Sequence, residues 1–155
     1  MLRPLADGDR AAIEAVLRSD ETFRDSEVAV ALELVDDGLK PGGSADYWFQ
    51  VAEQDGQVAG YICYGPTPMT DATFDLYWIV VGVGFRGRGL AKTLVQAMEA
   101  DLRQRGGRRV RVETEQIEAY SAARSLYQRL EYPLAAQLKD FYRQGEDLLI
   151  YYKEL

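Results

Sequence analysis

One segment decides how this chain folds: Ile79-Val80-Val81-Gly82-Val83-Gly84-Phe85-Arg86-Gly87-Arg88-Gly89-Leu90-Ala91. It starts as an apolar, β-branched strand, passes through glycines and continues as an amphipathic helix. Glycines let the backbone turn tightly and expose successive N–H groups, and a helix N-terminus adds partial positive charge. Arg86 and Arg88 add full charges. The segment therefore predicts an anion site suited to a phosphate-bearing cofactor, with a purely structural tight turn as the alternative.

The sequence before this segment predicts a sheet with Thr73–Val81 as its middle strand. That run is nearly all apolar, as expected of a strand buried on both faces. Tyr47–Glu53 and Gln57–Tyr64 are two β-rich runs joined by Gln54-Asp55-Gly56, a strong hairpin signal. Leu2–Leu5 is predicted as a short edge strand.

Helical spacing of apolar residues predicts helices on both sides of the segment. In the second of them Val30, Leu34 and Val35 are expected to face the core. The predicted helices are Asp7–Arg18, Ser26–Leu39, a helix from Gly89 that stops at Gly106-Gly107, and Glu118–Leu130. The remaining predicted strands are Val110–Thr114 and two around Gln144-Gly145-Glu146. With 155 residues and no repeat, the whole chain 1–155 is predicted to be one domain.

Composition excludes several classes of function. Histidine is absent, which excludes Ser/His/Asp and Cys/His catalysis and zinc sites that need imidazole, and no metal is expected. The net charge of −7 has the wrong sign for a nucleic-acid backbone or an anionic lipid surface. No stretch approaches the roughly 18 apolar residues of a spanning helix, and the N-terminus lacks a signal-peptide core, which predicts a cytoplasmic protein.

Two common nucleotide motifs do not fit the glycine segment. A Walker A loop needs a Lys-Ser/Thr pair after its last glycine, where this chain has Leu90-Ala91. A Rossmann motif needs a ribose-binding acid and a repeated parallel βαβ pattern, and both are missing. Cys63 lies in a predicted strand and is expected to be a buried structural thiol.

The segment resembles the signature of the GNAT acetyltransferases, Gln/Arg-x-x-Gly-x-Gly/Ala, through Arg86, Gly89 and Ala91. The resemblance covers essentially the whole chain, including the Arg3-Pro4-Leu5 opening and the run Ala123–Tyr127. It implies the α/β (α+β) fold of acyl-CoA N-acyltransferases. That fold has a mixed, mostly antiparallel sheet of about six or seven strands, flanked by about four helices.

The resemblance also implies acetyl-CoA as the cofactor, bound where the fourth and fifth strands splay apart. The pantetheine arm would run along the open edge of the fourth strand, much as an added strand would. The pyrophosphate would sit on backbone N–H groups of the glycine turn. The implied cofactor-binding residues are Ile79, Val80, Val81, Arg86, Gly87, Arg88, Gly89, Leu90 and Ala91.

Acid and base candidates follow from the same resemblance. Tyr127 matches the tyrosine that protonates the departing CoA thiolate, with a role in the core as the alternative, and Val81 would supply an oxyanion-binding N–H. Asp75 falls where histone acetyltransferases of this fold carry the base, and a carboxylate in an apolar strand is costly unless it is hydrogen-bonded or functional. Its alternative is a solvent-facing strand start; Glu113 and Glu115 are the rival bases. Tyr120 replaces the asparagine of the family pattern.

The acceptor is expected to be an amine, attacking acetyl-CoA directly in a ternary complex. Between Ser19 and Asp37 seven acids stand against one base, which would steer a cationic acceptor or simply form a solvated helix face. Two other functions stay open: an acyl-CoA-binding regulatory module without turnover, and a domain whose acidic helices dock a basic protein. The apolar run Leu148–Tyr152 is a candidate homodimer surface.

Overall fold

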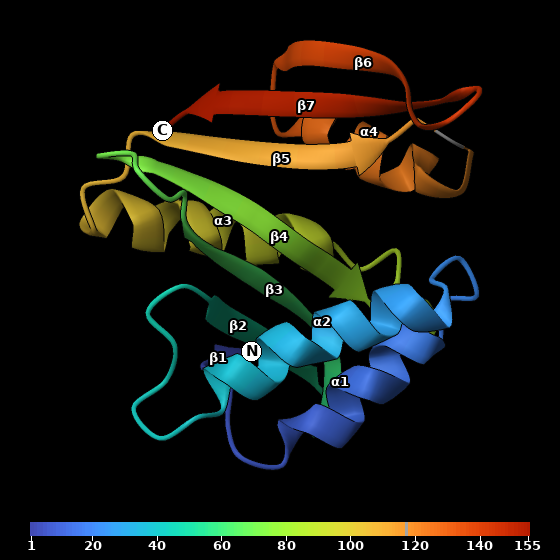
Figure 1. Ribbon diagram of the computed structural model, residues 1–155. Coiled ribbons are helices and arrows are strands. Elements are labelled where there is room, and N and C mark those ends of the chain that lie inside the picture. The colour runs from blue at the N-terminus through green and yellow to red at the C-terminus, as the bar shows by residue number, and fades with distance from the viewer. Residues whose placement is uncertain (117) are drawn as a thin grey trace.

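The computed structural model describes residues 1–116 and 118–155, and within them seven strands form one sheet flanked by four α-helices (Figure 1). The strand order is β1-β2-β3-β4-β5-β7-β6, and only β4 and β5 run parallel. The strands are β1 (Leu2–Arg3), β2 (Trp48–Gln54), β3 (Gln57–Pro66), β4 (Thr73–Val81), β5 (Arg109–Glu115), β6 (Leu134–Arg143) and β7 (Glu146–Glu154). The helices are α1 (Asp9–Arg18), α2 (Asp25–Gly38), α3 (Leu90–Gln104) and α4 (Ser121–Arg129), with the 3₁₀ turns η1 (Val83–Phe85) and η2 (Glu118–Tyr120).

The central strand and the following helix lie where the sequence predicts them. β4 has the predicted bounds and is the fourth strand of the seven described. Helix α3 ends as predicted at Gly106-Gly107, where Gly107 N–H donates to the Leu102 carbonyl. The mixed sheet with four helices confirms the predicted fold class.

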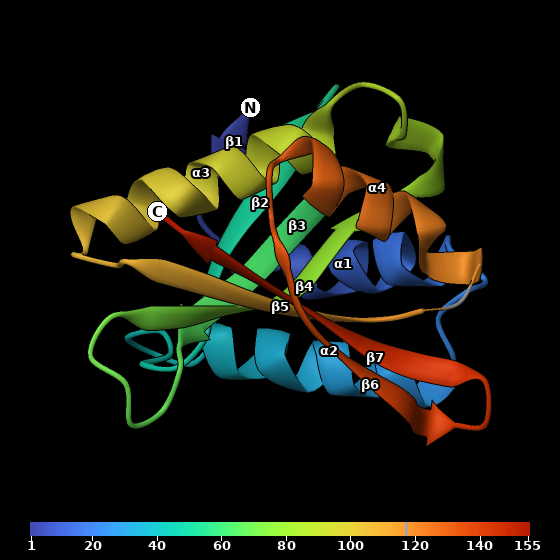
Figure 2. The same ribbon diagram turned by 90° about the horizontal axis from the view of Figure 1, so that it is seen from above.

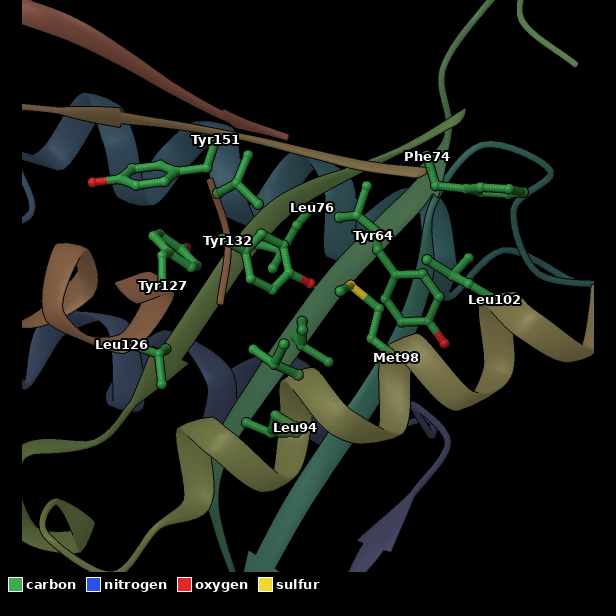
Figure 3. Packing of buried hydrophobic residues seen from close by; sticks show 14 of the residues in the cluster. Tyr64, Phe74, Leu76, Leu94, Met98, Leu102, Leu126, Tyr127, Tyr132 and Tyr151 are labelled. Atoms are coloured by element: carbon green, nitrogen blue, oxygen red, sulfur yellow. The ribbon is translucent and has the colours of Figure 1, made fainter. Parts of the chain in front are cut away.

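Two hydrophobic clusters fill the two faces of the sheet. On one face α3 and α4 pack their apolar stripes, with Leu94, Met98 and Leu126 buried (Figure 3). On the other face α1 and α2 pack over β3 and β4, with Ile13 and Leu17 fully buried. Figure 2, seen from above, shows α3 and α4 together along one side of the strands.

A β-bulge in β4 sets the shape of the sheet. Cys63 of β3 pairs with Trp78, and Tyr64 pairs with Leu76. Tyr77 therefore has no pairing partner on β3. A bulge bends its strand and increases the local twist. The parallel pairing with β5 also ends at Leu76, opposite Val112. Beyond the bulge β4 and β5 diverge, as Figure 1 shows.

The structure corrects some predictions of burial and length. Val30 does not face the core and is 48% exposed, because α2 is apolar around most of its circumference and turns Val28, Ala31, Leu32 and Val35 inward instead. β4 is buried on both faces only at its start. The last predicted helix begins with the turn η2, and α4 itself starts at Ser121.

The predicted dimer surface is mostly interior. Leu148–Tyr152 belongs to β7, which lies between β5 and β6, and Leu148, Leu149 and Tyr151 are buried. Tyr152 is the exposed aromatic side chain of this run. Most of the apolar surface of this run is therefore buried within the chain.

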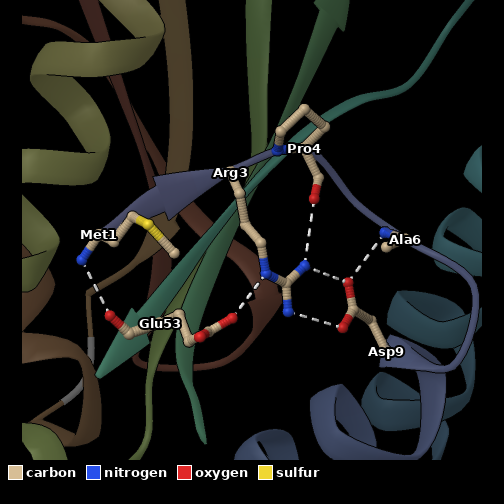
Figure 4. A network of polar contacts seen from close by, with 6 residues as sticks. All are labelled: Met1, Arg3, Pro4, Ala6, Asp9 and Glu53. Carbon is tan, nitrogen blue, oxygen red and sulfur yellow. Dashed lines mark hydrogen bonds and ion pairs between the residues drawn. The ribbon is translucent and has the colours of Figure 1, made fainter. Parts of the chain in front are cut away.

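An arginine near the N-terminus joins three elements (Figure 4). Arg3 on β1 donates two hydrogen bonds to the Asp9 carboxylate on α1, at 2.7 and 2.9 Å, and its Nε donates to Glu53 on β2 at 2.7 Å. Asp9 also accepts the backbone N–H of Ala6. The hydrogen bond from Arg3 lowers the pKa of Asp9, against the opposing effect of burial. This network ties the edge of the sheet to the first helix.

We expect Asp9→Asn to lower the free energy of unfolding at neutral pH by about 2 kcal/mol, because a charged hydrogen-bond acceptor is lost. A group with a lowered folded pKa stabilises the fold above its unfolded value, which is ordinarily 3.8, and that contribution is lost as the pH falls through the folded pKa. The deficit should therefore shrink below about pH 4. Denaturant titrations at several pH values measure it. The exposed Asp7→Asn is the control, and an equal loss in both variants would contradict this role.

Candidate functional site

The parting of β4 and β5 opens the main cavity of the molecule. Its volume is about 860 Å³, and it is lined by the second half of β4, by β5, by the first turn of α3, and by residues of α2 and α4. Because β5 leaves β4 at Leu76, the strand edge beyond that point has a neighbour on the β3 side alone. The cavity therefore occupies the position that a further strand would fill.

The ladder geometry shows which backbone groups face this cavity. Gly82 N–H donates to the Ala59 carbonyl on β3 at 2.9 Å. Peptide groups along a strand point alternately to its two sides, so those of Val81 and Ile79 point away from β3, toward the open edge. Both residues line the cavity, as does Val80. The open edge is suited to an extended ligand that carries amide groups.

The turn before α3 presents N–H groups at the other end of the cavity. Gly87 and Gly89 have φ angles of 76° and 77°, a conformation that favours glycine. Gly89 is the N-cap of α3, and no side chain caps this end. Within the described residues the N–H groups of positions 87–91 have no protein acceptor. Such a helix N-terminus binds anions through free N–H groups and the helix dipole.

The two arginines of the turn behave differently. Arg86 lines the cavity, forms an ion pair with Asp20 of the α1–α2 connection, and donates from Nε to the Val81 carbonyl at 3.2 Å. Arg88 lies over the ring of Phe85, 5.9 Å from its centre, and is the one predicted cofactor residue that does not line the cavity. The charge that an anion would meet here comes from Arg86, from Lys92 in the first turn of α3, and from the helix end.

Tyr127 combines a core ring with a hydroxyl that borders the cavity. The residue is 3% exposed, and its ring packs against those of Tyr132 and Tyr151, at 5.8 and 5.3 Å between centres (Figure 3). Its hydroxyl has no hydrogen-bond partner among the described residues, and unlike that of Tyr61 it is not fully enclosed. Burial raises the pKa of Tyr127 well above that of an ordinary tyrosine. At neutral pH it is a neutral phenol able to donate a hydrogen bond.

Asp75 lies in the cavity wall, where β4 and β5 are still paired. It is 6% exposed, so the solvent-facing alternative is wrong. Arg111, its neighbour on β5, donates from Nε to Asp75 Oδ1 at 2.7 Å, and Thr67 donates to Oδ2 at 2.9 Å. The ion pair with Asp75 raises the pKa of Arg111. Each oxygen keeps a further lone pair for another donor.

Of the seven acids between Ser19 and Asp37, Asp20 and Glu27 line the cavity. Three of the others form ion pairs on the surface: Asp25 with Arg18, Asp36 with Arg10, and Asp37 with Lys40. Asp20 is itself paired with Arg86, so among the described acids of this group Glu27 alone lines the cavity without an ion pair. Among the described residues no group of three acidic, histidine or cysteine side chains is placed to hold a metal, and no helix is long and apolar enough to cross a membrane.

Sequence reasoning missed the aromatic wall of the cavity. Phe23 stands edge-on to Trp78 and to Tyr120, at 5.8 and 6.5 Å between ring centres. The bulge at Tyr77 puts Tyr77 and Trp78 together on the α1 and α2 face, which the sequence of a nearly all-apolar strand does not reveal. The one available signal was Tyr120, a bulky ring where the family pattern has asparagine.

Comparison with known proteins identifies the family to which the chain belongs. The model of the acetyltransferase (GNAT) family matches residues 11–132. A crystal structure of a Desulfovibrio desulfuricans protein assigned to the GNAT family is 39% identical, covers 99% of this chain and 98% of its own, and superposes with a TM-score of 0.95. A search of curated protein sequences finds no match.

More distant structures share the fold. The ribosomal-protein-S18-alanine N-acetyltransferase of Escherichia coli has 20% identity and a TM-score of 0.79, over 99% of this chain and 92% of its own. An aminoglycoside 6′-N-acetyltransferase complexed with coenzyme A has 17% identity and a TM-score of 0.77, over 99% and 96% of the two chains.

We expect Gly89→Ala to weaken binding of coenzyme A, the ligand implied by the sequence resemblance, by about tenfold. A Cβ at φ +77° costs about 1–2 kcal/mol, so the turn relaxes and its N–H groups no longer converge. Calorimetric titration measures the affinity. Gly84→Ala is the matched control, since Gly84 lies in the same loop without a positive φ and its Cβ would meet no neighbour. Equal affinities in the two variants would contradict the role of the turn.

Proposed function

Because the chain belongs to the GNAT family of acetyltransferases, we propose that it transfers an acetyl group from acetyl-CoA to a primary amine of a small molecule or peptide. One observation carries this proposal: a single cavity joins the uncapped N-terminus of α3, the open edge of β4 and the hydroxyl of Tyr127. These are the groups needed to hold a diphosphate, an amide-bearing arm and a departing thiolate. We propose a cytoplasmic location as well.

For acetyl-CoA, the N–H groups of the turn Arg86–Ala91 would hold the pyrophosphate, and the open edge at Ile79 and Val81 would hold the arm. The thioester supplies an acyl carbon that an amine can attack. Val81 is the proposed oxyanion donor, which its outward-pointing peptide group supports.

The proposed reaction is a direct attack. The neutral amine nitrogen forms a bond to the acyl carbon, the C–S bond breaks, and the departing thiolate takes the phenolic proton of Tyr127. The nitrogen loses one proton as the amide forms, and this proton returns through solvent to the Tyr127 phenolate, so the enzyme ends in its starting state. A covalent acyl-enzyme at cysteine is disfavoured, because Cys63 is fully buried on β3 and burial raises the pKa of its thiol. The neutral, unpartnered phenol of Tyr127 supports its role as the acid.

We expect Tyr127→Phe to lower kcat with the best amine by at least about tenfold while leaving the affinity for acetyl-CoA unchanged. The variant removes the hydroxyl and keeps the ring in its cluster. Turnover is followed by thiol release against a panel of amines, amino acids and lysine peptides. Tyr151→Phe removes a hydroxyl from the same cluster outside the cavity wall and should retain full activity. Acetyl-CoA binding without turnover of any amine would favour the regulatory module.

For the base we propose Asp75, directly or through a water. It lines the cavity near the place where β4 and β5 part, and both of its oxygens can accept one more hydrogen bond. An amine must lose its proton before it can attack, so an acceptor that is protonated at neutral pH needs such a group.

Asp75→Asn should lower kcat/KM about a hundredfold at neutral pH, and the deficit should narrow as the pH approaches the amine pKa of about 10.4, where the free amine no longer needs a base. A pH series of kcat/KM measures this. Thr67→Val removes one partner of Asp75 and keeps the carboxylate, so it should retain most activity. A deficit that stays constant across the pH range would mean that Asp75 acts only as the structural partner of Arg111.

A further inference from the structure

The part of the cavity under α2 is walled by carboxylates and aromatic rings. Glu27 from α2 and Glu113 and Glu115 from β5 line it together with Phe23, Trp78 and Tyr120. The Tyr120 hydroxyl donates to Glu27 Oε1 at 3.1 Å. This part of the cavity lies on the α1 and α2 face of the sheet, opposite the face that α3 and α4 cover.

These carboxylates lack a cationic partner in the described part of the chain. No lysine or arginine there forms an ion pair with Glu27, Glu113 or Glu115, although Arg24 and Arg143 are near enough to lower the pKa of Glu115. Arg111 pairs with Asp75 and Arg143 with Glu146. Glu27 and Glu115 are partly buried, whereas Glu113 is exposed. Gathering like charges in a partly buried space is unfavourable unless a cation joins them.

The pKa of Glu115 reflects this arrangement. Burial raises its pKa, and the charges of Glu146 and Glu27 raise it further, while Arg143 and Arg24 oppose the effect. Glu27 therefore lies close enough to Glu115 for its charge to raise the pKa of Glu115. A ligand cation between them would relieve the repulsion and favour the ionised form of both.

A second feature of the same cavity indicates a ligand independently. Tyr127 is 3% exposed and lines the cavity, yet its hydroxyl has no hydrogen-bond partner within the described part of the chain. A buried hydroxyl without a partner is unfavourable, so a bound molecule is expected to supply one. Tyr127 marks the reacting end, and the carboxylates lie on the other side of the parted strands.

We propose that the acceptor is a diamine or polyamine, and that Glu27 and Glu115 bind its second, non-reacting ammonium group against the aromatic wall. The inference rests on the proposed acetyl transfer and specifies its substrate class. The reacting amine must be neutral when it attacks, so it cannot balance the carboxylates at that moment. A second ammonium group stays charged throughout, and the faces of Trp78 and Tyr120 favour it further.

The test compares 1,4-diaminobutane with butylamine as acceptors. We expect the diamine to have a kcat/KM at least about tenfold higher. Glu27→Gln and Glu115→Gln should each raise KM for the diamine about tenfold, with kcat little changed and with butylamine unaffected. Glutamine at position 27 keeps an oxygen for the Arg24 N–H at the start of α2, so the helix cap is preserved. Glu33→Gln, an exposed change of equal charge on the same helix, is the control.

Equal kcat/KM values for the two amines, or equal losses with both amines in the variants, would overturn the inference while acetyl transfer itself stands. If no amine is acetylated, the proposed function fails instead, and binding still decides the inference. Calorimetry of 1,4-diaminobutane with the coenzyme A complex should show binding that Glu27→Gln and Glu115→Gln together abolish. Undiminished binding in that double variant would refute the assignment.

Discussion

The rest of the structure depends on one constraint: β4 loses its parallel neighbour at Leu76. A strand in the middle of a sheet normally satisfies its peptide groups on both sides, and an open edge inside a protein is unfavourable unless something fills it. The bulge at Tyr77 bends β4 just as pairing with β5 ends, so the edge opens into a cavity rather than into solvent. Helices α3 and α4 cover one side of this opening and α2 the other.

The opening also places different groups on the two faces of the sheet. Ile79 and Val81 pack toward α3, whose N-terminus holds the free N–H groups, whereas Trp78 packs toward α1 and α2. The bulge produces this division, because it changes the alternation of side chains between Leu76 and Trp78. Tyr127 reaches the opening from the α4 side, and Asp75 marks the point where the strands part.

The sequence predicted the elements whose signals are local. The predictions of a strand at Thr73–Val81 and of a helix after Gly89 were right. A β-branched run, a glycine turn and a four-residue apolar period are local signals that need no tertiary information. The bulge was not predictable, since a strand that is nearly all apolar shows too little alternation for a break in it to be visible. The partner of Asp75 lies on another strand, and only its parallel register brings Arg111 beside it.

The net charge of the chain says little about the site, because folding decides which acids are paired. A charge of −7 spread over the sequence disfavours nucleic acid, but it does not show which acids lack partners. Folding neutralises several acids of the α2 region by ion pairs on the surface and leaves Glu27 in the cavity. That cavity is lined both by the positive end of α3 and, on the α2 face of the sheet, by carboxylates without ion pairs among the described residues. Such a polarised cavity complements an anionic acyl donor and a cationic acceptor at once, which a uniformly acidic surface could not do.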